Sequence, residues 1–257
     1  MTPTVEVAKD GHILLITLNR PEARNAVNKD LATHLEEALD ILEDDKKIRC
    51  AVLEGKGPAF CAGADLKEIA SGNGASLSTK KGGFAGIVWR ERTKPLIAAV
   101  DGPALAGGTE IVLSCDLVVA STRASFGLPE VTRSLIAAAG GVFRLPKALP
   151  RAIALEALLT GQPISAQTAY NYGMVNHLVA PDKALEDALE LAQTICANAP
   201  LAVSETYKLV KHSLVSTDEH NLFIESRNAL NRLSLTNDYL EGPRAFIEKR
   251  PPKWSGS

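Results

Sequence analysis

Two glutamates carry the side chains best suited to catalysis in this 257-residue chain. Glu110 falls in the first turn of a predicted helix at residues 109–115, among mostly apolar neighbours. Glu130 follows a predicted strand at residues 116–121 and comes directly after Pro129. A carboxyl group buried in such surroundings has a raised pKa, which suits general acid–base catalysis. The alternatives are a solvated glutamate that complements the helix dipole for Glu110, and a solvated loop residue for Glu130.

Short runs of small residues precede two predicted helices. They are Ala62-Gly63-Ala64, before a short helix near Asp65, and Ala106-Gly107-Gly108, before the helix of Glu110. The first amides of a helix have no internal partners and lie at the positive end of its dipole. Two such amides directed at one point form an oxyanion hole, which stabilises developing charge by about 3–4 kcal/mol per donor. Either loop alone is explained by a tight turn, but two loops beside a carboxylate pair favour a site that polarises a carbonyl group.

The motifs of several other enzyme classes are absent from the sequence. Residues 102–108 read GPALAGG, which is not a GxGxxG fingerprint, and Gly55-Lys56-Gly57 lacks the Walker spacing. No GxSxG elbow occurs, and Ser114 lies in an apolar helix. The sequence therefore disfavours a nicotinamide dehydrogenase, a phosphate-binding NTPase and a serine hydrolase.

The composition is that of an ordinary globular protein, with 46% hydrophobic and 23% charged residues. A formal net charge of −2 predicts no nucleic-acid and no membrane partner, because both usually select a basic surface. The four cysteines show no metal-ligand spacing, so we expect no metal site and buried thiols in a reducing compartment. No run of 18 apolar residues and no export leader is recognised, which predicts a cytoplasmic protein.

The N-terminal part alternates strands and helices around these loops. The Asp10-Gly11 turn predicts a hairpin, and Asn28 is a plausible N-cap for an amphipathic helix that runs to about residue 44. Residues 71–83, rich in Gly, Ser and Lys, are expected to form a mobile surface loop, followed by a short helix. The strands expected here lie at residues 5–8, 13–18, 48–53, 96–100 and 116–121.

After residue 141 the predicted structure is almost entirely helical, with one strand at residues 174–179. An α/β front and an all-α tail therefore share the chain without an obvious linker. The helices expected in this part lie at residues 151–160, 165–172, 183–198, 201–214, 219–235 and 238–249.

Dispersed motifs along the whole chain resemble the crotonase superfamily, in particular the enoyl-CoA hydratase/isomerase family. The matching segments occur in the family's order, which makes the resemblance specific. They are residues 16–21 with Asn25-Ala26, residues 59–66, residues 94–100 with Gly102, residues 106–110, residues 126–130, Gly140-Gly141 with Arg144-Leu145, residues 159–161 with Ala166, residues 173–175 and residues 246–250.

The resemblance implies an α/β fold, in which a spiral of repeated β-β-α units is followed by a C-terminal helical trimerisation region. Residues 1–197 would form the spiral core with the active site, and residues 198–257 the oligomerisation region. The chain would assemble as a homotrimer or a dimer of trimers. It would bind an acyl-CoA substrate and need no separate cofactor, since coenzyme A is part of the substrate.

The resemblance also implies roles for the residues singled out above. The backbone amides of Ala64 and Gly107 would hold the thioester oxygen, which agrees with the two small-residue loops. Hydratases of this family carry both Glu110 and Glu130, whereas the related Δ3,Δ2-isomerases generally keep only the latter. Hydration of a 2-enoyl-CoA to a 3-hydroxyacyl-CoA is therefore expected. The alternatives are isomerisation, a carnitinyl-CoA dehydratase-like reaction, favoured by residues 82–86 and 241–254, or a non-catalytic RNA-binding homologue.

Six further residues are expected to contact coenzyme A because of their positions in the family pattern. They are Arg24, Ala62, Asp65, Leu66, Phe246 and Lys249, of which the last two would reach a neighbouring subunit's coenzyme A. The acyl pocket is expected from residues 71–89 and 132–143. Two residues there depart from the family pattern. Ala138 replaces a glycine whose amide approaches the catalytic water. For Arg133 two alternatives are open: its side chain points outward, or it lowers the pKa of a neighbouring carboxyl group and weakens that group as a proton donor.

Overall fold

The N-terminal hairpin begins the main sheet of the protein. In the computed structural model, which describes residues 3–257, β1 (Val5–Asp10) and β2 (Ile13–Leu18) pair antiparallel around a two-residue turn. Gly11 takes a φ of +56° in this turn, which a glycine adopts without the steric cost of a side chain. The predicted hairpin is confirmed, and β1 extends two residues beyond its predicted end.

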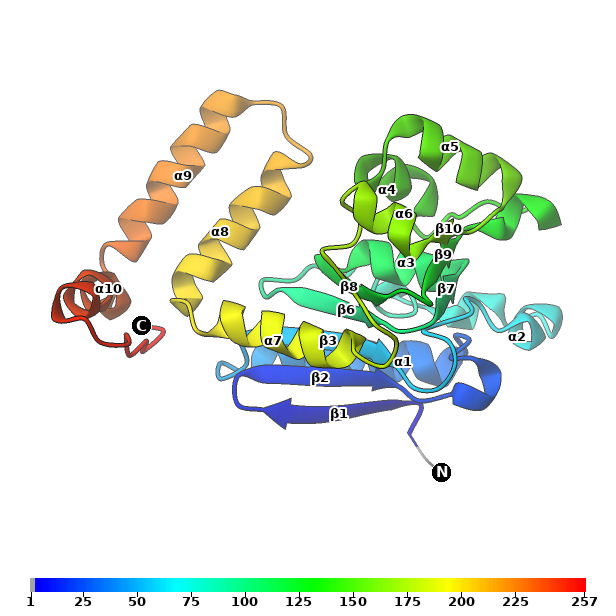
Figure 1. Ribbon diagram of the computed structural model, residues 1–257, viewed down its shortest axis with the longest axis horizontal. Helices are drawn as coiled ribbons and strands as arrows, with labels where there is room; N and C mark the ends of the chain where they lie inside the picture. Colours follow the sequence, from blue (N-terminus) through cyan, green and yellow to red (C-terminus); the bar gives the residue numbers. More distant parts are fainter. Residues whose placement is uncertain (1–2) are drawn as a thin grey trace. The chain divides into compact units, whose positions relative to one another are not determined.

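Six strands form the main sheet in the order β1-β2-β3-β6-β8-β11 (Figure 1). All neighbouring pairs except β1 and β2 are parallel. Every residue of β6 is buried, as its continuous apolar run predicts. The strands not yet defined are β3 (Cys50–Gly55), β6 (Leu96–Val100), β8 (Leu117–Ser121) and β11 (His177–Val179).

A smaller sheet makes the fold a repeat of β-β-α units. Its strands, in the order β10-β9-β7, are β7 (Pro103–Leu105), β9 (Ser125–Gly127) and β10 (Ile164–Ser165). In one unit β6 lies in the large sheet, β7 in the small sheet, and α3 (Gly107–Ser114) follows. In the next unit β8 lies in the large sheet and β9 in the small sheet, and the 3-10 helix η3 (Pro129–Arg133) follows. Sequence patterns did not predict β7 and β9, because three residues are too few for a periodic signal.

The first long helix, α1 (Lys29–Asp44), forms as its sequence predicts. The side chain of Asn28 accepts a hydrogen bond from the Leu31 amide at 2.9 Å, which is an N-cap. The predicted apolar stripe is buried in full and belongs to the hydrophobic core; it consists of Leu31, Leu35, Ala38, Leu39 and Leu42.

The predicted mobile loop at residues 71–83 is instead a structured segment. It contains the 3-10 helix η2 (Gly74–Leu77) and the paired strands β4 (Ser78–Thr79) and β5 (Gly83–Phe84), and Leu77 is buried in the core. The helix expected after it does not form, and residues 85–95 make turns, a bend and irregular chain. The chain doubles back there, since Ala85 and Gly86 both have positive φ and the Trp89 amide donates to the Gly82 carbonyl at 2.8 Å.

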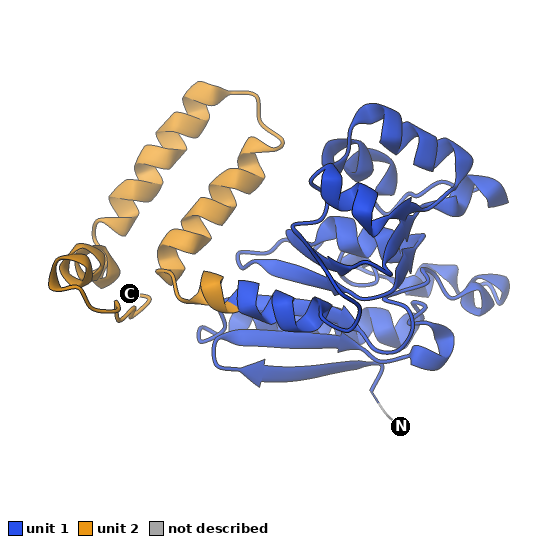
Figure 2. Cartoon of the chain, viewed as in Figure 1, with its two compact units in different colours: residues 1–192 blue, residues 193–257 orange. Residues whose placement is uncertain are grey.

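The remaining helices that begin in the first compact unit, residues 1–192, are α2 (Leu66–Ala70), α4 (Gly141–Ala148), α5 (Arg151–Thr160), α6 (Ala166–Asn171) and α7 (Ala184–Cys196). In this unit α2 follows β3, α4 and α5 follow η3, α6 contacts β10 of the small sheet, and α7 begins after β11 (Figures 1 and 2). The second unit, residues 193–257, is helical, and within it α8 (Pro200–Ser213) packs against α9 (Glu219–Leu233). The last helix is α10 (Asn237–Glu248). No helix among residues 3–257 is long and apolar enough to cross a membrane.

Candidate active site

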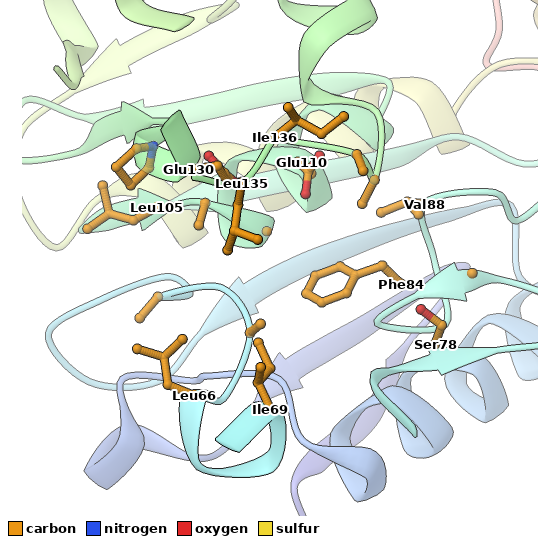
Figure 3. Close-up of a pocket in the computed structure, with 18 of the residues that line it drawn as sticks. Leu66, Ile69, Ser78, Phe84, Val88, Leu105, Glu110, Glu130, Leu135 and Ile136 are labelled. Carbon is orange, nitrogen blue, oxygen red and sulfur yellow. The ribbon is translucent and has the colours of Figure 1, made fainter. Parts of the chain in front are cut away.

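A cavity of about 680 Å³ opens in the first unit and brings most of the predicted site residues together (Figure 3). Its walls are largely apolar, with four charged side chains among them, a composition typical of small-molecule sites. It is lined by Ala62, Ala64, Leu66, Ile69, Ser78, Thr79, Lys80, Gly83, Phe84, Val88, Trp89, Leu105, Ala106, Gly107, Glu110, Pro129, Glu130, Arg133, Leu135, Ile136, Ala138 and Ala139.

Glu110 lies in the first turn of α3 and is only 4% exposed. Its Oε1 accepts a hydrogen bond from the Gly141 amide at 3.0 Å, and the Ala139 amide also donates to this carboxyl group. Burial raises the pKa of Glu110 to about 7; the charge of Glu130 adds to the rise, and the two amides and Arg144 oppose it. The carboxyl group is therefore buried in the cavity wall and is not a solvated helix-start glutamate.

Glu130 lies in η3, directly after Pro129, and faces the same cavity (Figure 3). Its Oε2 is buried and receives no hydrogen bond from any residue between 3 and 257. Burial raises the pKa of Glu130, while its own backbone amide and the charge of Arg133 oppose the rise. Of the two alternatives for Arg133, the structure favours the one in which its charge lowers the pKa of Glu130, but burial outweighs that effect. Both glutamates favour the protonated form more than an exposed glutamate does.

The amide of Gly107 lies at the start of α3, where no intrahelical acceptor exists for it. The amide of Ala64 does not begin a helix as expected, because α2 starts at Leu66 with Asp65 as its N-cap. Ala64 instead forms a parallel bridge with Val27. That bridge uses the carbonyl of residue 63 and the amide of residue 65, so the Ala64 N–H is directed away from Val27.

The two small-residue loops lie against each other. A Cβ built on Gly63 would lie 2.8 Å from the Cβ of Ala106 and 3.0 Å from the amide nitrogen of Gly107, so only glycine fits there. Gly63 also has a φ of +93°. The two loops therefore lie side by side, and Ala64 and Gly107 both line the cavity.

Ala106 has an unusual backbone conformation for a residue with a side chain, with φ of +50° and ψ of −125°. Such strain costs on the order of 1–3 kcal/mol and persists only where the surroundings fix it. Here the Ala106 amide donates to the Gly127 carbonyl at 2.7 Å, and the Thr109 hydroxyl bridges the backbone of residues 104 and 127. The small sheet therefore holds the turn that presents Gly107, a feature that sequence patterns did not reveal.

The residues expected to contact coenzyme A are only partly brought together. Ala62 and Leu66 line the cavity, and the exposed Arg24 adjoins them, since its carbonyl accepts the Ala62 amide at 3.0 Å. Asp65 does not line the cavity; its carboxylate caps α2 at the Lys67 amide and pairs with Arg20 at 3.1 Å.

Phe246 and Lys249, the other two residues expected to contact coenzyme A, belong to the second unit. Phe246 lies in α10 and is 86% exposed, and the exposed Lys249 is the C-cap of that helix. Lys249 has a φ of +54°, and its amide donates to the Phe246 carbonyl at 3.3 Å, so a left-handed turn ends the helix.

The segments expected to form the acyl pocket, residues 71–89 and 132–143, both contribute to the cavity wall. Phe84 packs directly on the proposed oxyanion loop, because a Cβ on Gly107 would lie 2.4 Å from its Cε1 atom. Ala138 also lines the cavity, but its amide donates to the Ile136 carbonyl at 2.8 Å. The amides that reach Glu110 are those of Ala139 and Gly141.

The donor groups that could hold a metal ion do not gather in this site. Across residues 3–257, no cluster of three or more His, Cys, Asp or Glu side chains has the arrangement of a metal site. The cavity walls carry two carboxyl groups with raised pKa values and backbone amides beside them.

Comparisons with known proteins give one consistent family. The model of the enoyl-CoA hydratase/isomerase family matches residues 8–257. The chain is 40% identical to Enoyl-CoA hydratase EchA19 of Mycobacterium tuberculosis, over 98% of this chain and 96% of that one. It is 38% identical to a Carnitinyl-CoA dehydratase of Salmonella arizonae over the full length of both. Among solved structures, an enoyl-CoA hydratase from M. tuberculosis is 45% identical with a TM-score of 0.94, over 99% of this chain and 100% of that one.

Proposed function

The chain belongs to the enoyl-CoA hydratase/isomerase family, and we propose that it adds water across the C2=C3 double bond of a 2-enoyl-CoA to give a 3-hydroxyacyl-CoA. The family and its crotonase fold were predicted from the sequence and are confirmed. The observation that carries the proposed reaction is the meeting, in one cavity, of Glu110 and Glu130 with the adjacent loops of Ala64 and Gly107.

The proposed reaction begins with the thioester oxygen bound by the amides of Ala64 and Gly107. This polarisation makes C3 electrophilic, and a water between the two carboxyl groups attacks it. Glu110 takes a proton from that water as the O–C3 bond forms. The π electrons move to the thioester as an enolate, and protonated Glu130 then delivers its proton to C2. Transfer of the proton from Glu110 back to Glu130 restores the starting state.

The pKa values of both carboxyl groups are raised, which suits proton transfer near neutral pH. A pKa of about 7 for Glu110 leaves a large fraction ionised at neutral pH, as a general base requires. Glu130 keeps a buried oxygen without a hydrogen-bond donor in the described chain, which favours its protonated form.

Binding of the coenzyme A part is proposed at one edge of the cavity. Ala62 and Leu66 would contact it, Arg24 would meet its nucleotide end, and the Asp65–Arg20 pair would hold the loop. Phe246 and Lys249 would contact the coenzyme A of a neighbouring subunit in a trimer or a dimer of trimers. No cofactor other than the substrate's own coenzyme A is proposed.

A carnitinyl-CoA dehydratase reaction is the second candidate. Phe84 and Trp89 both line the cavity, and aromatic faces attract quaternary ammonium groups. Relatives named Carnitinyl-CoA dehydratase also match the whole chain. A panel of crotonyl-CoA, longer 2-enoyl-CoAs and crotonobetainyl-CoA separates the two candidates, since preference for the last would favour the dehydratase.

Substitution of each glutamate tests the mechanism. Glu110→Gln and Glu130→Gln keep the side-chain shape but remove the proton transfer, so each should lower kcat for hydration of crotonyl-CoA by about 100-fold or more. The exposed Glu156, on α5, provides the matched control Glu156→Gln. Wild-type rates in both test variants would contradict the assignment.

A further inference from the structure

Arg144, on α4, does not line the cavity but hydrogen-bonds two segments of its wall. The guanidinium is half-buried; its Nη1 donates to the Ala139 carbonyl at 3.3 Å and its Nη2 to the Val88 carbonyl at 2.6 Å. Ala139 and Val88 both line the cavity, although they lie on segments far apart in the chain. The planar fork of arginine suits two acceptors in fixed directions, which the ammonium group of lysine does not reproduce.

The turn that Arg144 holds is the one that binds Glu110. Residues 139 and 141 supply the two backbone amides that donate to the Glu110 carboxyl group. Between them Gly140 has a φ of +120°, and a Cβ there would lie 2.5 Å from Arg144 Nη1. The guanidinium is thus packed directly on the turn, and its removal leaves the turn without support on that side.

The charge of Arg144 is not neutralised by a neighbouring ion pair. No carboxylate of residues 3–257 lies within 4 Å of its guanidinium. The charged or titratable groups that act on it are Glu110, Arg92 and Cys115, of which Arg92 pairs with Asp116 at 3.1 Å. Burial raises the pKa of Cys115 to about 12, so this thiol is neutral. Glu110, for its part, is acted on by Glu130 and Arg144.

We infer that Arg144 is a positioning residue, which fixes the turn that hydrogen-bonds Glu110 against the Val88 wall of the cavity and places a positive charge behind that carboxyl group. The inference rests on the proposed function only for its kinetic consequence, because the geometry of the turn stands without it. Arg144 acts through Glu110 and does not touch the substrate.

The kinetic experiment compares Arg144→Met, Arg144→Lys and the control Lys147→Gln, which removes an exposed charge from the same helix. Arg144→Met should lower kcat for crotonyl-CoA hydration by about 10-fold to 100-fold with little change in KM, because misplacement of a catalytic group affects the chemical step. The acid limb of its pH profile should move upward by about one pH unit, since a stabilising charge is lost. Arg144→Lys should lower kcat but leave that limb in place, and the control should match the wild type.

A second measurement does not depend on turnover. Carbon-13 NMR of labelled glutamate carboxyl groups follows the titration of Glu110, assigned by the signal missing from Glu110→Gln. Its midpoint should rise in Arg144→Met and stay near the wild-type value in Arg144→Lys. If the wild type hydrates no enoyl-CoA but the midpoint moves, the proposed function fails and the role of Arg144 stands.

Two results would overturn the inference. One is a folded Arg144→Met variant with kcat within twofold of the wild type and an unmoved midpoint. The other is an Arg144→Lys variant with wild-type kcat, and this result decides the question if Arg144→Met fails to fold. A positive charge alone would then be sufficient, and the two hydrogen bonds of the guanidinium would not position the turn that binds Glu110.

Discussion

The atoms around Glu110 and Glu130 determine how readily each of these two carboxyl groups ionises. Glu110 is buried but receives two backbone amides, whereas the buried Oε2 of Glu130 receives no donor from residues 3–257. Amide donors stabilise an ionised carboxylate, and a buried oxygen without a donor favours the protonated acid, although the backbone amide of Glu130 itself and the charge of Arg133 oppose this at Glu130. The two carboxyl groups therefore differ in the hydrogen bonds that the backbone gives them, which residue type alone does not encode.

The raised pKa of Glu110 predicts how stability depends on pH. An unfolded glutamate ionises near its ordinary value of 4.5, but in the folded protein Glu110 ionises at about 7. Between these values the folded state holds more protons than the unfolded state, so the contribution of Glu110 to stability falls as pH rises and the full penalty is present above pH 7. Glu110→Gln removes the ionisation and keeps an oxygen for the Gly141 amide.

We therefore expect the stability of Glu110→Gln, relative to the wild type, to increase between pH 5 and pH 8. The upper bound of that increase is about 3 kcal/mol. Urea unfolding at both pH values measures it, with Glu156→Gln as the exposed control. A relative stability that does not change with pH would show that Glu110 ionises in the folded protein as it does in water.

At the scale of elements, length and periodicity decide what the sequence reveals. The stripe and the Asn28 cap of α1, and the continuous apolar run of β6, predict these elements correctly. The three-residue strands β7 and β9 carry no such signal, yet they hold the strained turn at Ala106. The site residues were found through glycine spacing and family motifs. Contacts such as Arg144 with Val88 join distant segments, so no local pattern contains them.

Phe84, on the short strand β5, packs against Gly107, so we predict that the effects of substitutions at these two residues on kcat are coupled. Gly107→Ala would place a methyl group 2.4 Å from the Phe84 ring, so the ring or the loop must move. We expect kcat to fall by about 100-fold, because displacement of one oxyanion donor has an effect of that size. In the Phe84→Ala background the methyl group has room, and Gly107→Ala should then cost much less. This non-additivity is the signature of direct contact.

A double-mutant cycle on kcat for crotonyl-CoA measures that coupling. Gly74→Ala is the matched control, because a Cβ there has no neighbour closer than 3.9 Å and the backbone needs no positive φ. Equal losses from Gly107→Ala in both backgrounds would show that the damage arises elsewhere than at Phe84.

At the scale of the whole molecule, the helical unit of residues 193–257 leaves large apolar side chains uncovered. Leu235 is 89% exposed, Phe246 86% and Ile247 78%. Apolar side chains this exposed, where they form a contiguous surface, mark an interaction site or promote aggregation. A protein that remains in solution must cover it, and association of identical chains is the simplest means. This surface supports the proposed trimer or dimer of trimers independently of the active site.

Light scattering coupled to gel filtration tests the assembly. We expect the wild type to elute with the mass of three or six chains, each of 27.3 kDa. Phe246→Asp places a charge on the apolar surface and should yield smaller species, whereas Phe246→Leu preserves an apolar side chain and should preserve the assembly. If Phe246 also contacts a neighbour's coenzyme A, the smaller species should show a raised KM. A monomeric wild type at micromolar concentration would contradict the proposed assembly and, with it, the shared binding of coenzyme A.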